Sequence, residues 1–443
     1  MNVELRSVKT AAEQGLAEAF ARAKSALPGP GAVADLRARA FADFEARGLP
    51  HRRVEEWKYT DLRAMMRDAK PLAALPDAAT KARAKGAGDW LSAIKARRIV
   101  IVDGSFAPDL SDLAGLEKGL SIQPLSAVLA AGKVDAVNPL GVPPAMNSDS
   151  AVALNAAFMS DGVVIHVETG ARIERPLHLL YVAGAAPVAT FTRSVVVIGA
   201  RAEVTLIEDH EGPDGVEYQV NHVLELAIGD AAKLDRVKIG REGDKALHVA
   251  TLMGAIGANA KVNDFAFNAG GAVVRNQIAI RFEGEGTESL IGGASLLKDR
   301  QHVDNTMVID HAVGHCGGRE LFKSVLDGES RAVFQGKIIV RQDAQKTDSK
   351  MSSHALLLSE AAEADHKPEL EIFADDVVCG HGATAGALDD DLLFYLKSRG
   401  IPQKEAEALM IQAFIGEAVE AVAHEDLRDI LMDLVAQWVA ARA

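Results

Sequence analysis

A cysteine and a histidine lie two residues apart near the end of this 443-residue chain, at Cys379 and His381. A thiolate and an imidazole both bind transition metals, and both can meet a sulfur species. Residues i and i+2 of a β-strand point to the same face, so a strand here would set the two side chains next to each other. Two ligands are too few for a permanent cluster, because clusters usually take about four, mostly thiolates. The alternative is a buried cysteine beside a hydrogen-bonded histidine.

A second group of potential ligands consists of His311, His315 and Cys316. On a helix or a strand the two histidines would share a face, and in a strand Cys316 would point away from them. A zinc-protease pattern needs a glutamate directly after the first histidine, where this chain has Ala312. We therefore interpret these residues as loop or sheet residues rather than as a metal site.

Lys346, Asp348, Asp375 and Asp376 place an amine near several carboxylates, which could form an acid–base set. Charged side chains at strand ends are more often simply solvated. We expect a structural or interface role for these residues.

Two glycine-rich stretches, residues 270–271 and 284–286, could be taken for phosphate-binding loops. Neither is followed by Gly-Lys-Ser/Thr, and the sequence after them does not predict a helix. We expect both to be turns, and we expect ATP to bind a partner rather than this chain.

The composition is typical of a globular protein with an acidic surface. Hydrophobic residues make up 48% and charged residues 25%, and the formal net charge is −14. This charge argues against binding nucleic acid or an anionic membrane, because both favour a positive surface. No apolar run approaches the roughly 20 residues of a membrane span, and the first residues lack the apolar core of a signal peptide. Two cysteines do not make a disulfide framework, so a reducing cytoplasm fits best.

The elements before the middle of the chain are helical and then mixed. Residues 10–27 and 33–47 are rich in good helix formers. Thr60 is a plausible cap for a short helix, and Asp149 is one for a helix that runs through Met159. Between them we predict a strand with a following turn at residues 98–104 and a loop at residues 139–144.

Glycine recurs at even spacing through the middle of the chain. The heptapeptides that begin at Ile198, Ile228 and Ile256 share the pattern Ile-Gly-x-x-Ala-charged-aliphatic, and Gly170 and Gly286 extend the series more loosely. The spacings of these glycines are 29, 30, 28 and 29 residues. Such a period, with strands but no helix in each unit, predicts a β-solenoid. We expect glycine to supply a positive φ and the alanine to pack inside the coil. A β-sandwich stays open, although it gives no reason for the spacing.

Strand-like runs dominate from about residue 161, and helical patterns return after residue 388. A helix at residues 392–398 should end at Gly400, and Pro402 should start the next one. The last helix has an apolar stripe between residues 427 and 439 that needs a surface to cover it. We divide the chain into an N-terminal helical or mixed domain (1–147), a β-helix core (148–388) and a C-terminal helical domain (389–443). The strand-like runs are residues 163–167, 194–198, 204–207, 234–239 and 337–340.

The stretch from residue 341 to 384 resembles the SufB/SufD family of iron–sulfur cluster assembly proteins. Residues 56–61, Glu-Trp-Lys-Tyr-Thr-Asp, are similar to the SufD type, and the Cys-rich N-terminal motif of the SufB type is absent. Gly380 stands where a serine occurs in other members, and this departure leaves Cys379 and His381 in place. The matching segments are Lys346-Thr-Asp348, Met351, residues 356–358, residues 367–372, residues 374–376, Cys379-Gly-His-Gly-Ala-Thr384 and residues 394–401.

The resemblance implies a right-handed parallel β-helix between two helical domains, in a complex with a SufB-type subunit and two copies of a SufC-type ATPase. It implies that the C-terminal helices dock the ATPase and that the β-helix end pairs with the SufB-type subunit, where clusters are built. Cys379 and His381 would be this chain's contribution to a transient, shared cluster, with no cofactor permanently bound. The chain would be a non-catalytic scaffold and could form a homodimer in isolation. The candidate ATPase-docking residues are Phe394, Tyr395, Met410 and Phe414.

Two other hypotheses remain. A β-helix enzyme acting on polysaccharide would need an aromatic or charged groove, and aromatic residues are only 5% of the chain. A self-assembling structural solenoid is the second, and helices that cap both of its ends would hinder such assembly.

Overall fold

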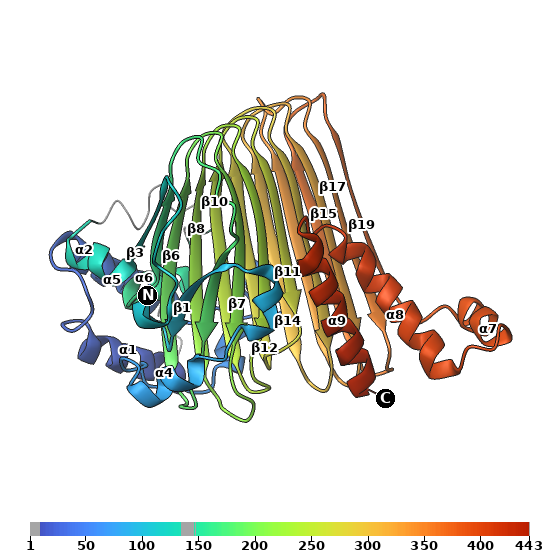
Figure 1. The fold of residues 1–443 in the computed structure, drawn as a ribbon, viewed down its shortest axis with the longest axis horizontal. Coiled ribbons are helices and arrows are strands. Elements are labelled where there is room, and N and C mark those ends of the chain that lie inside the picture. Colours follow the sequence, from blue (N-terminus) through green and yellow to red (C-terminus); the bar gives the residue numbers. More distant parts are fainter. Residues whose placement is uncertain (1–8, 134–145, 147, 443) are drawn as a thin grey trace, which may run out of the picture.

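The computed structural model describes residues 9–133, 146 and 148–442. Its body is a β-solenoid of about eight turns, with helices before and after it in the chain (Figure 1). The expected architecture is therefore confirmed. The predicted loop at residues 139–144 lies outside the described residues.

Successive strands of the solenoid alternate between two sheets, because the chain crosses from one sheet to the other in every half turn. The odd-numbered strands other than β3, together with β2, form one sheet, in the order β19-β17-β15-β13-β11-β9-β7-β5-β1-β2. The even-numbered strands other than β2, together with β3, form the other, in the order β18-β16-β14-β12-β10-β8-β6-β4-β3. Neighbours are parallel except at the first end, where β2 and β3 are antiparallel to β1 and β4.

The strands of the first sheet are β1 Arg97–Val102, β2 Ser105–Phe106, β5 Leu177–Val182, β7 Glu203–Glu211, β9 Lys233–Arg241, β11 Lys261–Asn268, β13 Glu288–Leu297, β15 Gly317–Leu326, β17 Asp348–Leu357 and β19 Val378–Gly386. Those of the second are β3 Leu120–Pro124, β4 Val163–Val167, β6 Ala189–Ile198, β8 Gln219–Ile228, β10 Leu247–Ile256, β12 Val273–Phe282, β14 His302–His311, β16 Arg331–Val340 and β18 Glu363–Ile372. The helices are α1 Ala11–Ala23, α2 Ala32–Arg47, α3 Leu62–Met65, α4 Ala78–Ala84, α5 Leu125–Ala130, α6 Ser150–Phe158, α7 Asp390–Ser398, α8 Gln403–Val419 and α9 Glu425–Arg442, with short 3-10 helices η1 Glu55–Trp57, η2 Asp89–Ile94 and η3 Pro108–Leu110.

The repeat glycines have a different role from the expected one. A Cβ atom on Gly199 would lie 2.4 Å from the backbone nitrogen of Thr169, and one on Gly229 would lie 2.7 Å from that of Ala200. Glycine is needed there because each turn approaches the backbone of the preceding turn closely. The positive φ occurs two residues later, so the prediction about φ was wrong. The residues that carry it are Arg201 (59°), Ala231 (55°) and Asn259 (53°).

The alanines of the repeat do pack inside the coil. Ala202, Ala232 and Ala260 are fully buried in the central apolar cluster. Gly170 and Gly286 do have positive φ, 71° and 72°, and they occupy the register position of Arg201 rather than that of Gly199. The looser part of the series is therefore shifted by two residues.

Helices α1, α2 and α6 pack against the outer face of the second sheet. Phe158 of α6 stacks on Phe191 of β6 with ring centroids 4.7 Å apart, and Phe20 and Phe41 of α1 and α2 join them. The predicted cap of α6 is confirmed, because Asp149 accepts hydrogen bonds from the backbone of residues 151 and 152.

Thr60 does not cap a helix. Its side chain is fully buried, and its hydroxyl lies 2.9 Å from His302 Nε2 and is hydrogen-bonded to Asp304. The cap of α3 is Asp61, which accepts a hydrogen bond from Ala64 at 3.0 Å. Thr60 therefore fastens the N-terminal region to the solenoid, a contact across 242 residues that no local pattern reveals.

The C-terminal helices α8 and α9 lie along the outer face of the first sheet (Figure 1). Their apolar faces are covered by each other and by outward-facing strand residues such as Val237 and Phe267. Helices therefore cover the two faces of the solenoid. None of the helices in the described part of the chain is long and apolar enough to cross a membrane. The fully buried residues of α8 and α9 are Ala406, Ile411, Ile415, Leu427, Leu431 and Val435.

Candidate functional site

Cys379 and His381 lie on β19, the last strand of the first sheet, where they pair with Ser349 and Met351 of β17. Met351 belongs to the central apolar cluster and Cys379 packs against that cluster. Because i and i+2 share a face, both side chains are directed to the interior side of the final turn. Cys379 is half-buried and His381 is exposed. The expectation that the two residues share a face of one strand is met.

Burial raises the pKa of the Cys379 thiol, and a hydrogen bond with the backbone of Ser349 offsets only part of this effect. The negative charge of Asp348 raises this pKa further, and so does that of Glu320 when it is ionised. Cys379 is therefore a protonated thiol at neutral pH, and it must lose that proton before it can bind a metal.

Glu320 is a buried carboxyl group close to this position that the sequence analysis missed. It lies on β15, one strand behind Met351, and Ser349 Oγ donates a hydrogen bond to its Oε2 at 3.5 Å. Burial raises the pKa of Glu320 to about 8, so this carboxyl is largely protonated at neutral pH. The sequence marks Glu320 only as a charged residue within a strand. That its side chain faces inward becomes clear once the register of the strand is known.

The last turn of the solenoid is not covered. In the sheet that ends at β19, no further strand follows among the described residues, and the same holds after β18. Phe373, in the connection between these strands, is 59% exposed, and Val378, the first residue of β19, is 60% exposed. Large apolar side chains at such exposure mark a surface that favours a partner.

The two terminal strands differ in how their edges are protected. Strand β18 alternates charged residues and contains Pro368, which has no N–H to offer to a further strand. Strand β19 runs Gly-His-Gly-Ala-Thr-Ala-Gly after Cys379, with small side chains and no acidic or basic group other than His381. The β19 edge is therefore the more open template for strand pairing.

The charged set around residues 346–376 is a group of surface ion pairs. Lys346 binds Asp376 through both its side chain and its backbone, and Asp348 binds Arg319 at 2.9 Å. These contacts tie neighbouring turns together.

The second group of potential ligands does not form a cluster. His311 is buried on β14 against Phe282, with ring centroids 4.6 Å apart, while His315 is in the following turn with a φ of 58°. Cys316 is buried, and its sulfur faces the carbonyl oxygens of Gly284 and Gly314. The glycines of residues 270–271 and 284–286 lie in the turns that connect β11 to β12 and β12 to β13, as expected.

The four expected docking residues fall into two environments. Phe394 and Tyr395 of α7 are 73% and 52% exposed, and α7 has no buried residue in the described chain. Met410 and Phe414 of α8 are half-buried. The ring of Phe414 packs under Lys323 Nζ of β15 at 4.5 Å, so it helps to fix α8 to the solenoid.

Comparisons with known proteins agree with this architecture. A family model described as SUF system FeS cluster assembly, SufBD core domain, matches residues 181–414, and one for the SufBD protein N-terminal region matches residues 12–179. The chain is 30% identical over 397 residues to the iron–sulfur cluster assembly protein SufD of Escherichia coli, which covers 88% of this chain and 89% of that protein. It is 30% identical over 402 residues to an iron–sulfur cluster assembly SufBD family protein of Synechocystis, which covers 87% of each. The SufD of Bacillus subtilis is 28% identical over 295 residues, 65% of this chain and 66% of that protein.

Proposed function

The chain belongs to the SufBD family of iron–sulfur cluster assembly proteins, as a SufD-type member with a role in the SUF system, and we propose that it is a non-catalytic scaffold subunit there. Family membership favours this function over the polysaccharide enzyme considered from the sequence. We propose that it works in the cytoplasm, where its two thiols stay reduced.

The observation that carries the proposal is the uncovered last turn with Cys379 and His381 on its inner side. A SufB-type subunit would pair with the edge of β19 and close this turn, which would bury Phe373 and Val378. The partner would supply the remaining ligands for a nascent cluster, which is cargo rather than a resident cofactor. Without the partner, two copies of this chain could meet at the same edge as a homodimer.

The exposed face of α7 and the adjoining part of α8 would bind a SufC-type ATPase. Phe394 and Tyr395 are exposed aromatic side chains on α7, a helix with no buried residue among those described. Exposed aromatic side chains of this kind are typical of interface anchors. Helix α8 also packs on β13 and β15. ATP-driven closure of two ATPases would pull on α7 and α8, and the motion would reach the last turns through this contact.

The junction would open and expose His381 as a nitrogen ligand for incoming iron. Cys379 would follow, since its raised pKa requires a proton to leave before the sulfur can bind. Glu320 is a nearby carboxyl group that also has a raised pKa. Its protonation state would respond to the negative charge of the Cys379 thiolate.

The test is purification of the tagged full chain from its native cells without oxygen, followed by identification of its partners and the absorbance spectrum. We expect SufB-type and SufC-type proteins to co-purify. In the reconstituted complex, His381→Ala should lower cluster formation at least about tenfold, while the matched control His166→Ala, an exposed histidine on β4, should not. Recovery of the chain without an ATPase, or full cluster formation by His381→Ala, would argue against the proposal.

Strand pairing has a separate test. Residues that bond one neighbour alternate along a parallel strand with those that bond the other, and Val378 donates to Thr347 of the preceding turn. Ala383 therefore presents its N–H to the free edge. Ala383→Pro should weaken partner binding, whereas Ala383→Ser, which keeps the N–H, should bind like the wild type.

A further inference from the structure

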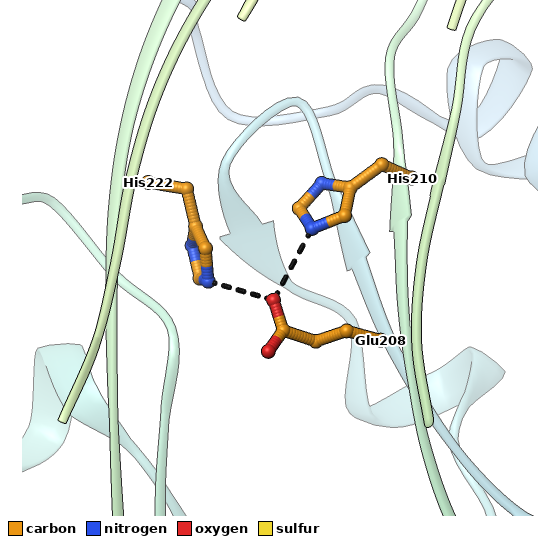
Figure 2. Close-up of side chains that lie close together, drawn as sticks. All are labelled: Glu208, His210 and His222. Atoms are coloured by element: carbon orange, nitrogen blue, oxygen red, sulfur yellow. Dashed lines mark hydrogen bonds and ion pairs between the residues drawn. The ribbon is translucent and has the colours of Figure 1, made fainter. Parts of the chain in front are cut away.

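Glu208, His210 and His222 form a buried cluster inside the solenoid, away from the open end. Glu208 and His210 are two residues apart on β7 and face inward, and His222 reaches them from β8 in the opposite sheet (Figure 2). All three are at most 1% exposed. His210 Nε2 lies 3.3 Å and His222 Nε2 lies 3.2 Å from the same oxygen, Glu208 Oε1.

A second carboxylate–histidine pair adjoins this cluster. His248 Nδ1 of β10 lies 2.9 Å from Glu242 Oε2, and the rings of His248 and His210 meet edge to face at 4.8 Å. The ligand atoms of His210, Glu242 and His248 lie within 4.8 Å of one another, as do those of Glu208, His210 and His222. His210 therefore belongs to both groups.

The spacing of the donor atoms matches that around a metal ion. Bonds of about 2.0–2.2 Å in a tetrahedral arrangement set neighbouring donors about 3.4 Å apart. The two nitrogen–oxygen separations of 3.2 and 3.3 Å are close to this value. Figure 2 shows both imidazole rings turned edge-on toward Glu208 Oε1.

Outer contacts orient these donors in the way that metal sites require. Arg236 Nε donates to Glu208 Oε2 at 2.8 Å, which leaves Oε1 for the histidines. His222 Nδ1 lies 2.8 Å from Thr192 Oγ1, so a proton on Nδ1 directs the lone pair of Nε2 to the cluster.

Several of these donors lack an ordinary partner. Neither ring nitrogen of His248 makes a hydrogen bond of normal geometry to a described residue, although Nδ1 is near Glu242, and the same is true of His222 Nε2. Buried polar atoms are rarely left in this state, and an unfilled ligand set is one of the accepted reasons. A cavity of about 30 Å³ adjoins His210 and Glu242, which is room for one ion or water.

A buried hydrogen-bond network is the competing interpretation, and the nearby cations favour it. Arg236 and Lys238 are buried beside the cluster. Arg236, however, also pairs with Asp264, and Lys238 Nζ donates to Asn276 at 2.9 Å.

We propose that Glu208, His210 and His222, with His248 and Glu242 beside them, bind one divalent transition-metal ion inside the solenoid, of the Zn²⁺ or Fe²⁺ class. Imidazole and carboxylate without thiolate suit these ions and disfavour Cu⁺. The ion would join β7 to β8 and β10 across the two sheets. This site is separate from Cys379 and His381, and it does not depend on the proposed scaffold function.

The experiment titrates Co²⁺ into the chelator-treated full chain, with Cys379→Ser and His381→Ala introduced so that the open end cannot contribute. We expect one Co²⁺ per chain, visible as a d–d absorption band that Zn²⁺ displaces. His210→Asn should weaken this binding at least about 100-fold, and Thr192→Val, which removes only an outer contact, about tenfold or more. The control His311→Asn changes a buried histidine outside the cluster and should leave the titration as in the parent.

A parent protein that takes up no Co²⁺, or a His210→Asn protein that binds it unchanged, would overturn the proposal. Should His210→Asn fail to fold, X-ray absorption of the Zn²⁺-loaded parent decides, because the proposal requires nitrogen and oxygen neighbours near 2.0–2.2 Å and no sulfur. Excess Zn²⁺ should also raise the thermal midpoint of the parent, and it should raise that of Thr192→Val by less at the same concentration, as about tenfold weaker binding requires.

Discussion

The two ends of the solenoid differ in how their last strands are arranged. At the first end, β2 and β3 run antiparallel to their neighbours and interrupt the repeat. At the other end, β18 and β19 keep the parallel register and nothing among the described residues continues them. The first end is thus complete within one chain, while the last turn is a surface suited to another protein. Apolar burial therefore stabilises the early turns. The exposed apolar side chains of the last turn remain available for burial in an assembly.

The strongest test of this difference compares two phenylalanines. Phe158 is buried in α6 over the early strands, and Phe158→Ala should lower the free energy of unfolding by about 3–5 kcal/mol. Phe373→Ala, at the 59%-exposed side chain after β18, should change it by less than about 0.5 kcal/mol. Urea unfolding of both variants measures the contrast, and similar losses would contradict it.

A pair of glycines sharpens the comparison at the backbone. A Cβ on Gly229 would approach Ala200 to 2.7 Å, whereas one on Gly382 of β19 meets nothing within 4 Å. Gly229→Ala should destabilise the chain by about 1–3 kcal/mol. Gly382→Ala should be neutral or stabilising by up to about 1 kcal/mol, because alanine restricts the unfolded chain. Thermal unfolding separates the two, and a destabilised Gly382→Ala would mean that β19 is packed after all.

The pH dependence should differ in sign between two buried groups, His302 at the contact with the N-terminal region and Glu320 behind Met351. Burial lowers the pKa of His302, the partner of Thr60, to about 4. Below pH 6.5 the unfolded chain takes up this proton and the folded chain does not, so stability falls as the pH drops from about 6.5 to 4. The slope is at most about 1.4 kcal/mol per pH unit. His302→Gln should reduce it in urea unfolding at pH 4.5, 5.5 and 6.5, and an unchanged slope would contradict the assignment.

Glu320 near the last turn should act in the opposite direction. Its pKa is raised to about 8, so the folded chain keeps a proton that the unfolded chain releases above pH 4.5. Its contribution is complete below that pH and is lost as the pH rises to about 8, again at no more than about 1.4 kcal/mol per unit. Glu320→Gln should flatten the decline of stability between pH 5 and 8. A parallel decline in wild type and variant would show that another group is responsible.

Local patterns in the sequence predicted the repeat, the cap of α6 at Asp149 and the shared face of Cys379 and His381, because each depends on residues close in the chain. The role of Gly199 could not be predicted, since its near contact with Thr169 exists only after the turns have stacked. Thr60 was misassigned for the same reason: its partners are on β14. Glu208, His210 and His222 meet across two sheets, and only the register of the whole coil brings them together.

The uncovered last turn also has a consequence for cooperativity. In a stacked repeat, each turn is stabilised mainly by its two neighbours, so a terminal turn with one neighbour opens most easily. Amide hydrogen exchange should therefore rise along the axis toward β19, with β18 and β19 the first to exchange. A bound partner would act as the missing neighbouring repeat and extend slow exchange into these strands. Assembly would then complete the folding of a turn that the chain alone leaves marginal.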